Sequence, residues 1–175
     1  MLSERNNIMY DRLTREDIKK MEEEIEHRIR VERPKLIADV QEARAQGDLS
    51  ENFEYKAAKQ AKNRNESRIR YLQNMIKTAE IYEDDSKDDE VGINNHVTVR
   101  FEDDGEEDSF KIVTTVRTDS LNNLISIESP FGKALMHHKV GDKVKIDIGP
   151  DNSYYVTILK IENTKDEVND TISSY

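Results

Sequence analysis

The strongest constraint on the fold is a regular spacing of side chains in residues 55–79. Alternating steps of three and four residues mark one face of a helix through Tyr55, Ala58, Lys62, Asn65, Ile69, Leu72, Ile76 and Ala79. Such a stripe is typical of a coiled-coil helix that packs lengthwise against a second helix. Its apolar members lie mostly toward the C-terminal end, so the packing is expected to weaken toward residue 55.

A second helical pattern precedes this one. Thr14, followed by Asp17 three residues later, is typical of a helix start. Apolar side chains then recur at steps near three and four, at Ile18, Met21, Ile25, Ile29, Leu36, Val40 and Ala43, with Glu32 in the one gap. Pro34 removes a helical hydrogen bond, so we expect a kink or brief break near Arg33, after which the helix resumes. The two patterns predict an antiparallel coiled-coil hairpin over residues 12–80.

The tip of this hairpin, residues 47–55, has the sequence GDLSENFEY. Gly47 can end the first helix in a left-handed conformation, and Asp48 can cap the second. Two interpretations of Asp48 and Glu51 stay open from the residues alone. They can form a capping box at the start of the helix, or they can offer two exposed carboxylates to a hard cation such as Mg²⁺.

Basic residues outnumber acidic ones just behind the tip. Between residues 55 and 70 the single acid is Glu66, against Lys56, Lys59, Lys62, Arg64, Arg68 and Arg70, with Arg44 on the preceding helix. This run is either a solvated helix face or a surface that follows a phosphate backbone. Phe53 and Tyr55 could add base stacking, although Tyr55 fits the coiled-coil stripe better.

The period changes to two beyond the hairpin. We interpret residues 81–91 as an acidic linker and residues 1–11 as an N-terminal extension. Alternating apolar residues predict strands near 96–101, 110–113, 124–127, 144–148 and 154–161, and Pro130 opens a short helix. Residues 92–163 therefore form a small α+β domain, followed by a polar tail at 164–175.

Composition narrows the functional classes. Residues 1–79 carry a net charge of +2 and residues 80–175 one of −12, so any contact with nucleic acid is expected in the first half. There is no cysteine, the four histidines lack metal-ligand spacing, and no segment has the pattern of a signal peptide or membrane span. We expect a cytoplasmic monomer without a membrane partner or a self-contained active site.

The segment from Glu42 to Ala58, EARAQGDLSENFEYKAA, followed by a sheet domain with Ser-Pro-x-x-x-Ala-Leu, resembles the GreA/GreB family of bacterial transcript-cleavage factors. The resemblance implies an α+β protein in which an N-terminal antiparallel α-helical coiled-coil hairpin precedes a small FKBP-like domain. It also implies that the hairpin enters the secondary channel of bacterial RNA polymerase. There it would stimulate cleavage of the backtracked nascent RNA near its 3′ end by the polymerase's own active site, so the chain would not be an enzyme by itself.

The resemblance also implies roles for single residues. Asp48 and Glu51 would hold a Mg²⁺ ion and the attacking water jointly with the polymerase. Arg44, Lys56, Lys59 and Lys62 would contact the RNA, and Gly47, Ser50, Asn52 and Tyr55 would support the tip. Lys59 stands where relatives often have arginine, which keeps the charge but loses bidentate phosphate geometry. Ser129, Pro130 and Phe131 would bind the polymerase.

Three rival functions stay open. The chain could be a Gre-like protein that modulates or inhibits the polymerase without cleavage, although retention of both tip carboxylates argues against this. It could be an FKBP-type chaperone or prolyl isomerase, for which the sequence offers few aromatic residues. It could also be a coiled-coil scaffold, which predicts self-association.

Overall fold

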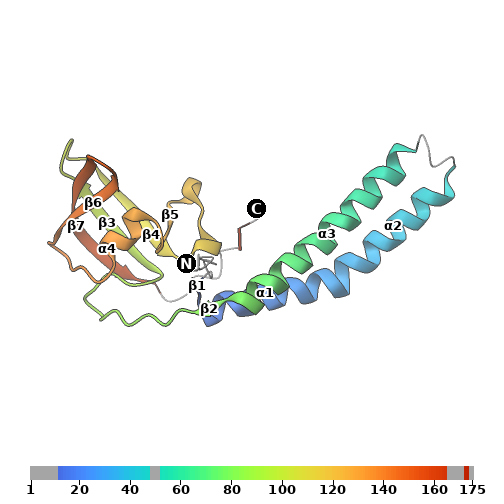
Figure 1. Cartoon of the computed structure of the whole chain (residues 1–175), viewed down its shortest axis with the longest axis horizontal. Coiled ribbons are helices and arrows are strands. Elements are labelled where there is room, and N and C mark those ends of the chain that lie inside the picture. The colour runs from blue at the N-terminus through green and yellow to red at the C-terminus, as the bar shows by residue number, and fades with distance from the viewer. Residues whose placement is uncertain (1–11, 48–51, 165–171, 174–175) are drawn as a thin grey trace, which may run out of the picture. The chain divides into compact units, whose positions relative to one another are not determined.

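A computed structural model describes residues 12–47, 52–164 and 172–173 of the chain (Figure 1). It consists of two compact units. The helical unit includes residues 15–80, and the sheet unit includes residues 12–14 and the chain from residue 81 onward. This organisation confirms the predicted α+β class, with an N-terminal helical hairpin followed by a separate sheet domain.

Four helical segments build the helical unit. They are α1 (Arg15–His27), the π-helical turn η1 (Arg28–Glu32), α2 (Arg33–Ala45) and α3 (Phe53–Thr78). The first three follow one another without a gap and run alongside α3, which returns in the opposite direction (Figure 1). The long hairpin expected from the two helical patterns is therefore present.

The predicted break at Pro34 takes the form of the π-helical turn. Pro34 lies in the first turn of α2, immediately after η1. A proline has no N–H to donate, and its ring clashes with the carbonyl of the preceding turn. A π-helical turn inserts one extra residue and shifts the phase of the helix. The chain therefore passes the proline without leaving the helical path.

The burial of side chains follows the stripe predicted for residues 55–79. All eight predicted positions, seven in α3 and Ala79 directly after it, are buried or half-buried, and Asn65, Ile69 and Leu72 are the most enclosed of them. On the opposite helices, Met21 and Ala43 are buried. The apolar packing is concentrated away from the tip, as the distribution of apolar residues predicted.

Charged side chains join the two halves of the hairpin near its middle. The carboxylate of Glu24 accepts hydrogen bonds from Arg28 Nε at 2.7 Å and from Arg68 Nε at 2.9 Å. Arg28 Nη1 also donates to Asn65 Oδ1 at 3.2 Å. Arg68 is only 8% exposed. We call these four residues the polar cluster.

A bidentate ion pair lies beside the polar cluster. Arg33 donates to the two carboxylate oxygens of Glu66 at 2.7 and 2.8 Å. These hydrogen bonds lower the pKa of Glu66. Polar side chains thus fix the longitudinal register of the helices where apolar side chains are sparse.

A five-stranded sheet forms the centre of the sheet unit. Its strands are β3 (Asn95–Phe101), β4 (Glu107–Val113), β5 (Leu124–Ser126), β6 (Lys143–Gly149) and β7 (Asn152–Asn163), in the order β5-β4-β3-β7-β6. The β4–β5 pair is parallel and the other pairs are antiparallel. Two 3₁₀ turns, η2 (Thr115–Arg117) and η3 (Ser120–Asn122), connect β4 to β5. All five strands expected from the sequence are present.

Helix α4 (Pro130–Leu135) contributes to the core of the sheet unit. Its Leu135 is fully buried with Val97, Ile112, Ile146 and Ile158. The short strands β1 (Arg12–Leu13) and β2 (Glu80–Ile81) form a separate two-stranded sheet. Among the residues that the structure describes, no helix is long and apolar enough to cross a membrane.

The strict alternation predicted for residues 110–113 is wrong. Lys111, Ile112 and Val113 are buried in succession, and Lys111 is only 3% exposed. Both faces of β4 are therefore covered at this end, which an alternating pattern does not anticipate.

The acidic segment 81–91, interpreted as a linker, forms several contacts at its end. Val91 N donates to the carbonyl of His138 at 2.8 Å, and His137 N donates to the carbonyl of Val91 at 2.9 Å. Lys139 Nζ lies 2.6 Å from a carboxylate oxygen of Asp89. This part of the linker is thus fixed to the sheet unit. In the C-terminal segment, Ser173 N donates to the carbonyl of Val116.

Candidate functional site

Two helix ends meet at the tip of the hairpin. Helix α2 ends at Ala45, and α3 begins at Phe53 (Figure 1). Gly47 has a φ of 145°, a value that side-chain-bearing residues rarely adopt. Glycine therefore lets the chain turn away from α2 within two residues, as the sequence predicted.

The start of α3 is capped by Asn52, not by Asp48. The side-chain oxygen of Asn52 accepts a hydrogen bond from Tyr55 N at 2.9 Å. Its amide nitrogen donates to the carbonyl of Ala43 at 2.7 Å. One side chain thus caps α3 and binds the last turn of α2, so it fixes the distance between the two ends of the tip.

This cap corrects one of the two interpretations of the tip carboxylates. A capping box would need Asp48 as the N-cap and Glu51 inside the first turn of α3. The helix instead begins two residues after Glu51. Asp48, Ser50 and Glu51 lie outside the described residues, so their predicted roles stay predictions. The capping interpretation is excluded because the cap position belongs to Asn52.

The predicted RNA-binding residues lie at two kinds of position. Arg44 is exposed in the last turn of α2, and Lys56 and Lys59 are exposed in the first two turns of α3. Lys62 is half-buried on the coiled-coil stripe. Arg68, part of the basic run, belongs to the polar cluster and is not an exposed phosphate ligand. The exposed basic surface therefore has fewer members than the run of charges in the sequence, although Arg64 and Arg70 are exposed.

Aromatic rings accompany two of these lysines. Lys59 Nζ lies 6.0 Å from the ring centroid of Tyr55, and Lys56 Nζ lies 5.7 Å from that of Phe53. Both are cation–π distances. Tyr55 is half-buried, as expected for a stripe residue, whereas Phe53 is exposed.

The predicted polymerase-binding segment begins α4. Ser129 Oγ accepts a hydrogen bond from Gly132 N at 2.9 Å and donates to the carbonyl of Ser126 at 2.7 Å. The Phe131 ring meets Phe110 edge to face, with a centroid distance of 5.0 Å. Pro130 is exposed between them. Ser129 and Phe131 thus have structural contacts, and Pro130 offers the most accessible surface of the three.

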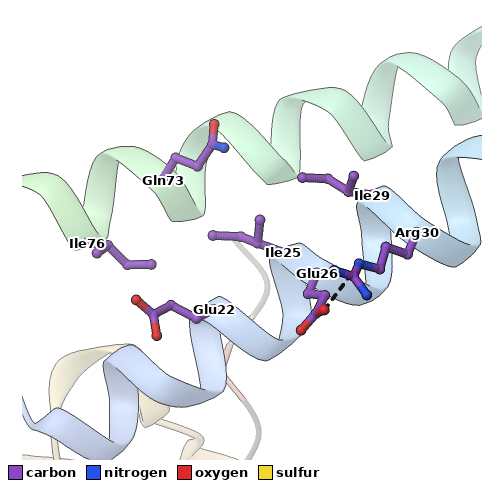
Figure 2. A pocket seen from close by; sticks show the side chains of 7 residues that line it. All are labelled: Glu22, Ile25, Glu26, Ile29, Arg30, Gln73 and Ile76. Atoms are coloured by element: carbon purple, nitrogen blue, oxygen red, sulfur yellow. Dashed lines mark ion pairs between the residues drawn. The ribbon is translucent and has the colours of Figure 1, made fainter.

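An apolar hollow lies elsewhere on the hairpin (Figure 2). It has a volume of about 480 Å³, and Ile25 and Ile29 face α3 across it. Glu26 and Arg30 form an ion pair at its rim, with a distance of 3.1 Å. Its other lining residues are Glu22, Gln73 and Ile76. None of the predicted site residues lines this hollow.

The tip motif offers one candidate donor set for a metal ion. Within residues 12–47, 52–164 and 172–173, no group of three or more acidic, histidine or cysteine side chains could hold a metal ion. Asp48 and Glu51 would offer two carboxylates. That set fits Mg²⁺, which usually takes one or two protein carboxylates and completes its shell with water and phosphate oxygens.

Comparison with known proteins shows the family. The family described as "Transcription elongation factor, N-terminal" matches residues 12–81. The one described as "Transcription elongation factor, GreA/GreB, C-term" matches residues 85–163. Both halves of the chain are therefore covered, and the boundary falls close to the one between the two units.

Two relatives named transcription elongation factor GreA agree with these matches. The chain is 43% identical over 162 residues to transcription elongation factor GreA of Mycoplasmopsis pulmonis, a match covering 93% of this chain and 99% of the relative. It is 44% identical over 135 residues to GreA of Thermotoga neapolitana, covering 77% of this chain and 86% of the relative. A crystal structure of GreA factor homolog 1 (Gfh1) of Thermus thermophilus is 28% identical, with a TM-score of 0.39, covering 87% of this chain and 99% of that one.

These matches define the protein as a transcription elongation factor. Its helical hairpin and its sheet domain each correspond to one of the two parts of such factors. The chain belongs to the GreA/GreB family.

Proposed function

We propose that this protein binds bacterial RNA polymerase through its secondary channel and stimulates hydrolysis of the backtracked nascent RNA near its 3′ end. The hairpin would carry the tip to the catalytic centre of the polymerase. The polymerase would perform the hydrolysis, so the factor is not an enzyme alone. It would act as a cytoplasmic monomer.

The cap of α3 is the observation that carries this proposal. Because Asn52 caps the helix, Asp48 and Glu51 are not needed as a capping box. A carboxylate engaged in capping is a poorer ligand, since its oxygens already accept backbone hydrogen bonds. The Asn52 amide also fixes the tip to Ala43. The two carboxylates thus belong to a short segment between two anchored helix ends.

Asp48 and Glu51 are the residues that would hold Mg²⁺ together with the polymerase. In phosphodiester hydrolysis a second metal ion helps to activate water and to stabilise the leaving oxygen. The part played by this chain is to position two carboxylates and to hold the attacking water by hydrogen bonds. Two carboxylates form an incomplete shell, so the remaining ligands would come from the polymerase and the RNA phosphate.

The other candidate residues fit supporting tasks. Arg44, Lys56 and Lys59 are exposed near the tip and can neutralise phosphates of the RNA 3′ segment. Lys62 would contribute its charge from the edge of the coiled-coil stripe. In the sheet unit, Ser129 and Phe131 shape the surface from which Pro130 protrudes, and this segment would contact the polymerase.

The test is transcript cleavage in a backtracked elongation complex made with the cognate polymerase. Wild type should shorten the RNA from its 3′ end. The double variant Asp48→Asn/Glu51→Gln should reduce the rate by at least about 100-fold while it still binds, because both charged ligands are lost. Competition with labelled wild-type factor measures the binding.

A matched control is available on α2. Asp39 and Glu42 are an Asp and a Glu with the same spacing of three positions, and both are exposed. Asp39→Asn/Glu42→Gln removes the same charge, and its cleavage rate should stay within about twofold of wild type because these residues lie outside the tip. If wild-type factor binds the complex without stimulating cleavage, the proposal fails, and a modulator that only occupies the channel takes its place.

A further inference from the structure

Phe53 is a large apolar side chain that the fold leaves in solvent. It is 82% exposed, although phenylalanine is among the residues most often buried. Its position on α3 explains the exposure. At about 100° per residue, Phe53 points away from the stripe that runs through Ala58 and Ile69. It therefore has no place in the packing of the hairpin.

The backbone beneath this ring is firmly held. Phe53 is the first residue of α3 and directly follows Asn52, which binds Tyr55 N at 2.9 Å and the Ala43 carbonyl at 2.7 Å. Lys56 N also donates to the carbonyl of Asn52 at 3.2 Å. The exposed ring is thus mounted on a capped helix end, which limits the entropy lost when something stacks on it.

Among the described residues, one lysine lies beside the ring and two further exposed cations lie on the adjoining helix turns. Lys56 Nζ lies 5.7 Å from the ring centroid, and Lys59 is exposed in the next turn. Arg44 is exposed at the adjoining end of α2. Glu54 is the acidic exception among the described residues of this first turn. An aromatic face with cations beside it is the pairing that single-stranded nucleic acid requires, because the base stacks and the phosphate is neutralised.

We propose that Phe53 is a stacking platform for a nucleobase in the single-stranded 3′ segment of the backtracked RNA, with Lys56 binding the adjacent phosphate. This inference rests on the proposed function, since that function brings the tip to the RNA 3′ end. Phe53 thereby holds the extruded nucleotide by its base, independently of the base's identity, and positions the phosphodiester bond for hydrolysis. A stacked base tolerates any sequence because every base has a π-face.

Cross-linking tests the contact without requiring cleavage. A backtracked complex is assembled on RNA with 4-thiouridine as the extruded 3′ nucleotide, irradiated with full-length factor, and the cross-linked residue is mapped by mass spectrometry. Wild type and Phe53→Trp should cross-link at position 53. Phe53→Leu keeps an apolar side chain but has no ring, and its yield should fall on the order of tenfold at equal occupancy.

A base-deletion experiment separates RNA from protein as the partner. The factor concentration for half-maximal cleavage is measured with a normal and with an abasic 3′ nucleotide. Phe53→Leu should raise this concentration on the order of tenfold on normal RNA and leave it unchanged on abasic RNA. An equal increase on both RNAs would show that the ring contacts the polymerase, and would overturn the inference.

The two hypotheses fail differently. A cross-link at position 53 without any cleavage by wild type would support the stacking platform and refute the proposed cleavage function. Cleavage by wild type without a cross-link at position 53 would refute the platform and leave the function intact. Circular dichroism of each variant confirms helix content, which should not change because the side chain packs against nothing in the stripe.

Discussion

Replacing Asn52 tests whether one side chain controls the geometry of the tip. In Asn52→Ala, the loss of the N-cap bond to Tyr55 N costs about 1 kcal/mol. The loss of the bond to the Ala43 carbonyl costs about another 1 kcal/mol. The total of about 2 kcal/mol acts on the ends of α2 and α3, far from the buried residues Ile69 and Leu72. Local opening is therefore expected, with little change in the global midpoint of unfolding.

Native-state hydrogen exchange measures this opening residue by residue. A difference of about 2 kcal/mol corresponds to roughly 30-fold faster exchange, and it should appear at the amides of Tyr55 and Lys56. Amides around Leu72 should exchange as in wild type. If the proposed function holds, transcript cleavage should also fall in this variant, because Asn52 no longer joins the start of α3 to the end of α2.

Asn52→Asp separates the two bonds. A carboxylate still accepts from Tyr55 N and suits the positive end of a helix, but it cannot donate to the Ala43 carbonyl. Exchange at Tyr55 should therefore stay near the wild-type rate, while the last turn of α2 exchanges faster by on the order of fivefold to tenfold. If the amide of Tyr55 in Asn52→Ala exchanged within about twofold of the wild-type rate, Asn52 would not hold the two helix ends together, and the reasoning about the tip would be wrong.

Two further predictions concern each unit separately. Burial alone would raise the pKa of Glu24, but hydrogen bonds from Arg68 and Arg28 outweigh it and lower the pKa. The ion pairs of Glu24 with Arg28 and Arg68 therefore stabilise the hairpin at pH values above about 4.3, the pKa of a glutamate in the unfolded chain. This stability is lost as the pH falls through the lower pKa that Glu24 has in the folded protein. Thermal midpoints measured by circular dichroism between about pH 6 and pH 3 should fall more steeply for wild type than for Glu24→Gln, and parallel profiles would contradict this. In the sheet unit, a methyl group on Gly132 would overlap the backbone carbonyl of Ser126. Gly132→Ala should therefore lower the free energy of unfolding, measured by urea titration, by about 1–3 kcal/mol. An unchanged midpoint of unfolding would show that α4 can shift to make room for the methyl group.

The helical pattern predicted the hairpin because its information is local. Spacings of three and four residues report which face of a helix is buried, and the positions from Tyr55 to Ala79 are enclosed accordingly. The position of Pro34 likewise predicted where the first arm would be interrupted. The π-helical form of that interruption could not be read from the residues, since it depends on how the arm keeps its face toward α3 across the proline.

Contacts between residues far apart in the chain could not be predicted from the sequence. Arg68 looked like one of several exposed basic residues, yet it lies buried against Glu24, 44 positions away. Its position beside the stripe, three residues after Asn65 and four before Leu72, sets it apart from Arg64 and Arg70, but the sequence does not identify Glu24 as its partner. Lys111 was placed on an alternating strand, and its burial follows from coverage of both faces of β4.

The prediction of Asp48 as the N-cap of α3 was wrong for a different reason. Asp48, Ser50 and Asn52 are all good N-cap residues, and the capping-box spacing favoured the first of them. The stripe gave a contrary signal, because it begins only at Tyr55. A helix start close to Phe53 is more consistent with that stripe than a start after Asp48, which would place the six residues 49–54 in the helix before its first packed position.

The distribution of interactions along the hairpin has a consequence for the tip. Ile69 and Leu72 supply buried apolar contacts, the polar cluster fixes the middle, and near the tip Asn52 joins the two helices by hydrogen bonds. Packing energy therefore declines toward the end of the hairpin that carries Phe53, where the hydrogen bonds of Asn52 position the helix ends. A tip built in this way can change its loop residues at little cost to the fold, provided that the cap and the bond to Ala43 remain. Variation is thus expected at position 53 and at the loop positions other than 48 and 51, whose carboxylates the proposed function requires, while position 52 is constrained by structure.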